Sequence, residues 1–243
     1  MSSLAYTRFE LLRTFRERRL FIFSFGFPLI LYYVIAAPNR NIRNFNGTGV
    51  SMPLYYMVGL ASFGTMMAAM SAGFRIAGER EAGWTRQLRI TPLSPRTYLR
   101  TKVVTAYAMA MISLGLLYVA GATLGVGMPA VTWLKMTGLI ALGLLPFAAL
   151  GIALGHLLTV DSTGPATGGL VSLLALVSGT WFPARGFLHT IGQWVPSYWL
   201  VQAGRISSHG HGWSTQGWGV VIGWTLVLGA LAAFAFVRDT GRV

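Results

Sequence analysis

The feature that most constrains this chain of 243 residues is a series of long apolar stretches separated by short polar ones. A helix needs about 20 apolar residues to cross the hydrocarbon core of a bilayer. Six stretches meet or approach that length, at residues 20–37, 53–74, 103–126, 133–158, 167–181 and 218–237, the fifth being the shortest. The loops between them are short. The sequence therefore predicts an all-α polytopic membrane protein, with one transmembrane domain over residues 1–243.

The composition excludes several other classes of protein. Charged residues make up only 10% of the chain, whereas soluble domains carry about 25%. An ordinary soluble enzyme is therefore excluded, and so is a disordered tail, because 54% of the residues are hydrophobic. The chain has no cysteine, which rules out a disulfide framework, a thiolate nucleophile and a zinc–thiolate site.

The distribution of charge predicts the orientation in the membrane. Fourteen of the 19 basic residues and all six acidic residues fall on the side that holds the N-terminal segment, loop 75–102 and the C-terminal tail. Basic residues accumulate in cytoplasmic loops. We therefore expect both termini and loop 75–102 to be cytoplasmic in a multi-pass protein of the cell inner or plasma membrane.

Residues 3–19 precede the first span and have the pattern of an interfacial elbow helix. At 100° per residue, the apolar side chains share one face and most polar side chains lie opposite: Leu4, Leu11, Leu12 and Phe15 against Glu10, Arg13, Thr14 and Glu17. Arg8 falls within the apolar sector. The alternative is a basic flank that only enforces topology.

Loop 75–102 predicts a short cytoplasmic helix between two spans. Glu79, Arg80 and Glu81 are expected to begin it, since acidic residues favour a helix start. Pro92 and Pro95 are expected to stop it. An edge of Trp84 and Leu88, one turn apart, suits docking into a partner's groove. The alternative is a solvated loop that only sets topology.

The same loop resembles the cytoplasmic loop of ABC-2 type permeases, the membrane subunits of ATP-binding-cassette exporters. The matching positions are Glu79, Arg80, Glu81, Gly83, Leu88, Thr91, Pro92, Leu93, Ser94, Tyr98 and Lys102. Trp84 departs from the pattern, because the family has a smaller residue there. A second matching motif follows the fifth span, at Ser178–Pro183, Pro196 and Tyr198, where the family forms short re-entrant helices on the outer side.

The resemblance implies six transmembrane helices with an elbow, a cytoplasmic coupling helix and an extracellular re-entrant segment at 182–205. It implies two kinds of partner: cytoplasmic ABC ATPase subunits, and a second permease copy or homologue that completes a dimer. The implied ATPase-docking residues are Glu79, Arg80, Glu81, Gly83, Trp84, Leu88, Arg89 and Pro92. The implied re-entrant motif residues are Gly179, Phe182, Pro183 and Pro196.

The sequence offers no candidate catalytic group. It lacks the Gly-x-x-x-x-Gly-Lys-[Ser/Thr] pattern of a P-loop, and no span carries an acidic residue in its middle, as a proton or cation relay would require. His209 and His211 could chelate a metal but have no third ligand nearby. We therefore expect no catalytic residue, metal site or cofactor in this chain, with ATP and magnesium on a partner ATPase.

These observations favour a permease subunit for ATP-driven efflux of an amphipathic small molecule, such as a drug or antibiotic, or of a lipid. Short outer loops and aromatic spans favour such cargo over a long polymer. Export of a polysaccharide or lipid-linked glycan remains an alternative, as does a non-transporting scaffold or sensor coupled to an ATPase. An integral membrane enzyme would need a catalytic constellation that the sequence does not offer. No substrate-binding residue can be assigned.

Overall fold

A computed structural model describes residues 3–17, 21–83, 94–205 and 212–240. All regular secondary structure in these ranges is helical. The elements are α1 (Ser3–Phe15), η1 (Ile22–Gly26), α3 (Phe27–Ala36), η2 (Phe45–Gly47), α4 (Met52–Met70), α5 (Ala72–Glu81), α7 (Pro95–Thr123), α8 (Ala130–Gly143), α9 (Leu145–Leu157), α10 (Val160–Ser178), α11 (Phe187–Gly192), α12 (Pro196–Gln202), η3 (Ala203–Arg205) and α14 (Thr215–Thr240).

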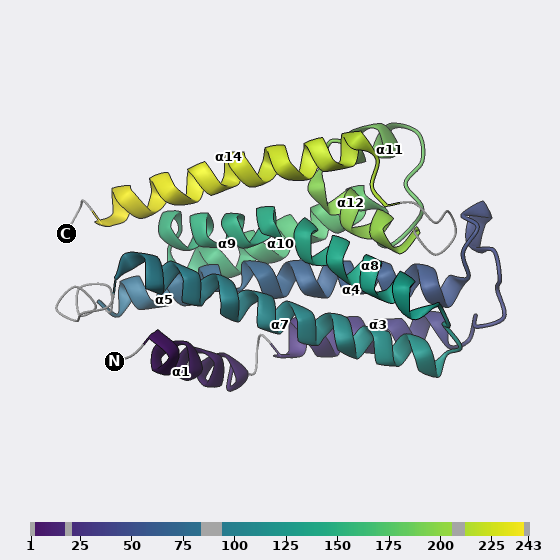
Figure 1. Ribbon diagram of the computed structural model, residues 1–243, viewed down its shortest axis with the longest axis horizontal. Coiled ribbons are helices and arrows are strands. Elements are labelled where there is room, and N and C mark those ends of the chain that lie inside the picture. Colours follow the sequence, from purple (N-terminus) through teal and green to yellow (C-terminus); the bar gives the residue numbers. More distant parts are fainter. Residues whose placement is uncertain (1–2, 18–20, 84–93, 206–211, 241–243) are drawn as a thin grey trace.

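The long helices lie side by side and form an elongated bundle (Figure 1). Helix α4 is the central helix, almost wholly buried and in contact with α3, α7, α9 and α10. Helix α14 packs along α9. Helix α1 and the C-terminal ends of α5 and α14 lie at the same end of the bundle (Figure 1). We call this the terminal end, and the other the opposite end.

Among the residues that the structure describes, five segments are long and apolar enough to cross a membrane: Met52–Glu81, Arg96–Thr123, Ala130–Leu157, Val160–Ser178 and Thr215–Asp239. They correspond to the second to sixth predicted spans. The first predicted span, 20–37, forms the π-helix η1 followed by α3, and its apolar helix, Ser24–Ala36, is shorter than a full span. The sequence thus predicted the class of fold, and five of the six spans reach the expected length.

The fifth predicted span, 167–181, differs from helix α10, which begins at Val160 and ends at Ser178. The helix therefore includes Pro165, which lies before the predicted start of the span. As the sixth residue of the helix, Pro165 lies past the first turn and lacks the amide that would bond to the Asp161 carbonyl. Gly179 follows the last helical residue, and its φ of +79° belongs to the left-handed region that glycine adopts without strain.

Pro95 opens α7, and the loop helix that Pro92 and Pro95 were predicted to stop lies outside the described residues. The Ser94 hydroxyl caps α7 by accepting a hydrogen bond from the Thr97 amide at 3.2 Å. Proline fits the first turn because the amide that it lacks would have no helical partner there. Helix α7 therefore starts eight residues before the predicted span 103–126.

Candidate coupling site at the terminal end

Helix α1 contacts the bundle through its polar face. Tyr6, Glu10 and Thr14 recur at every fourth position, which places them on one side of the helix, and all three are buried. The Thr7 and Thr101 hydroxyls are 3.1 Å apart, joining α1 to α7. Of the predicted polar face, Glu10 and Thr14 are turned toward the protein, whereas Arg13 is exposed.

Lys102 on α7 is the centre of a buried group of charges. Its ammonium nitrogen lies 2.5 Å from Glu10 Oε1 on α1 and 2.6 Å from Glu79 Oε1 on α5. The same nitrogen lies 5.2 Å from the centroid of the Tyr98 ring. The Lys102 side chain is 0% exposed. One lysine therefore joins three helices that are distant in sequence.

The two carboxylates receive further partners. The Tyr98 hydroxyl donates to Glu79 Oε2 at 2.7 Å, and Arg75 Nε lies 3.5 Å from Glu10 Oε1. We call Glu10, Arg75, Glu79, Tyr98 and Lys102 the charge cluster. Its two acids and two bases balance, which is necessary because an isolated buried ion would be strongly destabilising. Arg13, half exposed, adds a contact of 3.1 Å to Glu79 Oε1 at the edge.

Arg80 forms a second junction at the terminal end. Its Nε lies 2.9 Å from the carboxylate of Asp239 on α14. Its terminal nitrogen donates to the main-chain carbonyls of Gly155 and Leu158, at 3.1 and 3.2 Å. His156 Nδ1 lies 3.0 Å from Asp239 Oδ2. Arg80 thus ties the end of α5 to the ends of α9 and α14.

Glycines allow α5 and α9 to approach closely enough for this junction. A Cβ at Gly155 would lie 2.7 Å from the Gly73 carbonyl oxygen, and one at Gly73 would lie 2.5 Å from that of Gly151. These distances are too short for any other residue. The Gly151-x-x-x-Gly155 spacing therefore serves helix packing, as small residues do in membrane helices.

The predicted docking residues separate into two groups in the structure. Glu79 is buried in the charge cluster and Arg80 is engaged with Asp239, whereas Glu81 is exposed. Residues two apart on a helix point in different directions, which explains the contrast between the two glutamates. Their docking roles stay predictions. Trp84, Leu88, Arg89 and Pro92 lie outside the described residues.

The prediction that Glu79 to Glu81 begin a loop helix was wrong, because these residues form the last turn of α5. The Ala82 and Gly83 amides close that turn on Gly78 and Arg80, and Gly83 has a φ of +68°. Acidic residues are unfavourable at a helix C-terminus. The buried cations around Glu79 compensate for this.

The re-entrant motif lies at the opposite end, between α10 and α14 (Figure 1). The Tyr55 hydroxyl on α4 donates a hydrogen bond to the main-chain carbonyl of Gly179. The Tyr56 hydroxyl donates one to the main-chain carbonyl of Trp181, at 3.1 Å. Pro196 begins the buried helix α12, so two short helices, α11 and α12, stand in the predicted segment 182–205. Phe182 is exposed and Pro183 is half-buried. The predicted outward placement of this segment is untested.

The arrangement holds the helices of the terminal end together. Within the described ranges, no group of three histidine, aspartate or glutamate side chains converges to hold a metal. The charged side chains instead join α1, α5, α7, α9 and α14. The site thus joins five helices at the terminal end.

Comparison with known proteins identifies the family. Residues 33–237 match the ABC-2 family transporter protein family. The chain belongs to the ABC-2 transporter family. It is also 30% identical over 196 residues to "Putative transport permease YvfS" of Bacillus subtilis (strain 168), with 78% of each chain covered. The chain is thus an ABC-2 permease, a multi-pass membrane subunit, and such permeases generally pair with ABC ATPase subunits.

Sequence reasoning missed how the permease's charge cluster is assembled. Glu10 and Arg75 were not singled out as site residues, and Lys102 entered only as a motif position. One signal was present: polar residues stand four apart at the ends of apolar stretches, in the pairs Tyr6 and Glu10, Arg75 and Glu79, and Tyr98 and Lys102. Such pairs share a helix face.

Proposed function

We propose that this permease forms the pathway of an ATP-driven exporter of amphipathic small molecules, such as drugs or antibiotics, or of lipids. A separate ATPase subunit binds ATP and magnesium and supplies the energy. A second copy or a homologue of this chain completes the pathway, and η1 with α3 serves as the first of six spans. The membership of the ABC-2 family carries the proposal.

The terminal end is the end that faces the cytoplasm in this proposal. The excess of basic residues around the N-terminal segment, loop 75–102 and the C-terminal tail supports it, since such residues are retained on the cytoplasmic side. Cysteines introduced at Arg86 and Asn44, in a chain that has none of its own, test it directly. Impermeant thiol reagents should reach position 44 from outside intact cells and position 86 only after permeabilisation; the reverse would refute the orientation.

The charge cluster gives the proposal its mechanism. Loop 84–93 connects α5 to α7, and the contact between Glu79 and Lys102 holds these helices together beside that loop. Lys102 also holds α1 through Glu10. A displacement imposed on the loop by an ATPase therefore moves α1, α5 and α7 as one unit, and Arg80 passes the movement to α9 and α14.

Trp84 and Leu88 are the proposed apolar anchors of the ATPase on this loop. Aromatic residues dominate docking energies, so Trp84→Ala is expected to weaken association by about 2 kcal/mol, roughly thirtyfold. The measurement is recovery of the ATPase with affinity-tagged permease. Trp133→Ala, on α8, is the matched control and should keep wild-type recovery. Equal recovery for both variants would refute the docking role of Trp84.

A measurement of efflux from cells tests the proposed transport function directly. Cells expressing this permease with an ATPase subunit, taken from the neighbouring reading frame where one is present, should expel fluorescent amphipathic compounds or labelled lipids. An ATPase that lacks its P-loop lysine is the control. Retention of these compounds, combined with export of a glycan, would favour the polysaccharide alternative. ATPase binding without export of any cargo would favour the scaffold or sensor.

A further inference from the structure

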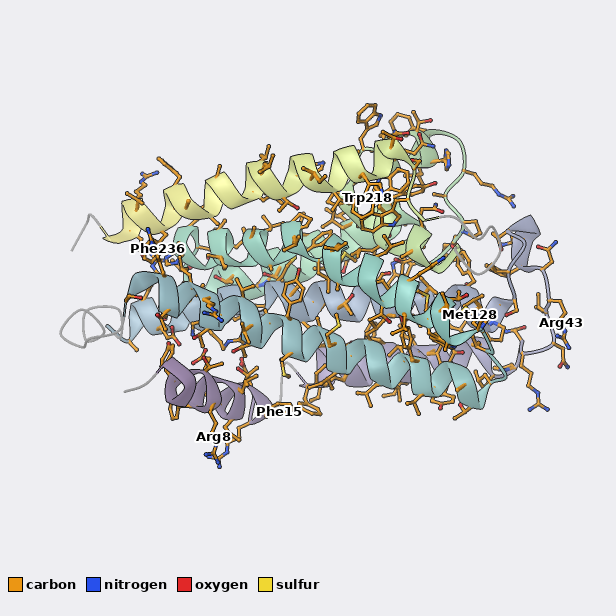
Figure 2. The ribbon with its side chains drawn as sticks, in the orientation of Figure 1. Arg8, Phe15, Arg43, Met128, Trp218 and Phe236 are labelled. Carbon is orange, nitrogen blue, oxygen red and sulfur yellow. The ribbon has the colours of Figure 1, made fainter. Side chains whose placement is uncertain are left out.

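The outward face of α1 combines apolar and cationic side chains. Phe9 and Leu12 are each 52% exposed and Phe15 is 42% exposed. Arg8 and Arg16 are exposed among them. Arg8 and Phe15 project from α1 away from the bundle (Figure 2). This face is opposite to the one that carries Glu10. One side of the helix therefore contacts the bundle, and the other side is exposed.

The apolar part of this face continues onto the first apolar helices of the bundle. The rings of Phe15 and Phe21 are 6.3 Å apart between centroids, and those of Phe21 and Phe25 are 4.6 Å apart. Beyond them, the exposed side chains are again apolar, as at Ile22 and Ile30. In a membrane protein an apolar surface of this kind faces lipid. The outward face of α1 therefore borders the lipid-facing surface.

The charge on this face is uncompensated within the described part of the chain. No ion pair is formed there by Arg8 or Arg16, whereas Arg13 contacts Glu79. The acidic residue nearest the middle of α1, Glu10, is turned inward and is held by Lys102. The outward face thus offers cations without competing carboxylates, which is complementary to negative charge.

We propose that the outward face of α1 binds anionic phospholipid headgroups. Arg8 and Arg16 pair with headgroup phosphates, while Phe9, Leu12 and Phe15 enter the boundary between headgroups and acyl chains. The ion pairs on the inward face hold α1 in place, so the lipid meets a fixed array of side chains. The site lies outside the residues that match the family, which begin at residue 33.

The test uses the purified permease in nanodiscs with one cysteine, Leu12→Cys, labelled with bimane. Brominated phosphatidylglycerol at low mole fraction should quench the probe more strongly than the same fraction of brominated phosphatidylcholine. A basic residue at an anionic surface contributes about 1 kcal/mol, so each arginine should enrich phosphatidylglycerol about fivefold. High salt should reduce the difference, since it screens exposed charges.

Arg8→Gln with Arg16→Gln, in the same labelled background, should bring the two lipids to equal quenching. The matched control, Arg40→Gln with Arg43→Gln, removes two exposed arginines at the opposite end and should leave the preference unchanged. Figure 2 shows how far Arg43 lies from α1. Equal quenching without the arginine substitutions, or a preference that survives Arg8→Gln with Arg16→Gln, would overturn the proposal. An absence of quenching by either lipid would also overturn it, and would favour a protein partner on this face.

Discussion

The two ends of the bundle are held together in different ways. Each ion pair found among the described residues lies at the terminal end, around Lys102 or Arg80. At the opposite end, aromatic side chains donate single hydrogen bonds to main-chain carbonyls, as Tyr56 does to Trp181 and Trp213 does to Trp199. The rings of Tyr198 and Trp199 also pack edge to face.

This difference suits what each end does in the proposed transporter. The stabilisation from a buried ion pair depends strongly on its geometry. Removing one partner leaves the other charge without compensation. Such pairs are therefore suited to moving helices as a unit. Aromatic packing with single hydrogen bonds is weaker in each contact and distributes the stabilisation over many residues. The comparison predicts that single substitutions have larger effects at the terminal end.

The largest effect is expected for Lys102→Met. The substitution keeps most of the side-chain volume but leaves Glu10 and Glu79 buried without their shared cation, which should destabilise the protein by about 3–5 kcal/mol. Thermal unfolding in nanodiscs measures the loss. Lys135→Met is the matched control, because Lys135 is exposed at the opposite end and should change stability by less than about 0.5 kcal/mol. Equal stability of the two variants would contradict the role of the charge cluster.

Glu79→Gln and Glu81→Gln should separate stability from docking. Glu79→Gln removes the charge that balances Lys102 and should destabilise the protein by about 3 kcal/mol. Glu81→Gln should leave unfolding unchanged, because its side chain is exposed, and should weaken only the recovery of the ATPase. The same unfolding temperature for both variants would mean that the burial of Glu79 has no energetic consequence.

Gly59→Ala tests how closely the opposite end is packed. A Cβ there would lie 2.8 Å from the Thr180 carbonyl oxygen, a main-chain atom with little freedom to move. Overpacking of this kind should destabilise the protein by about 2 kcal/mol. Gly115→Ala is the control, since a Cβ at Gly115 meets open space, and it should be neutral or slightly stabilising. A neutral Gly59→Ala would show that the contact with Thr180 relaxes easily.

The smallest effect is expected for Tyr56→Phe, which removes one hydroxyl and its hydrogen bond to Trp181. A single neutral hydrogen bond contributes about 1 kcal/mol. The unfolding temperatures of Tyr56→Phe and Lys102→Met, measured side by side, compare the two ends most directly. A loss at Tyr56→Phe that equals the loss at Lys102→Met would remove the distinction.

The sequence by itself determined the class of the protein. Apolar stretches of spanning length left little choice beyond a helical membrane protein, because the backbone must satisfy its own hydrogen bonds in lipid. The loop motif from Glu79 to Lys102 indicated the ABC-2 family, which residues 33–237 confirm. The division of residues 3–19 into two faces was also readable, since helical periodicity alone fixes which side chains share a side.

Only the tertiary structure decided what those faces meet. Periodicity places Glu10 on the polar face of α1, but it cannot show that this face lies against Lys102, 92 residues away. Periodicity also places Glu79 and Glu81 on different sides of α5, but it cannot show which of the two is buried in the charge cluster. The polar face of a helix can lie against water or against a buried cation of another helix. Which of the two it meets depends on which helices pack together, and packing is a property of the whole bundle.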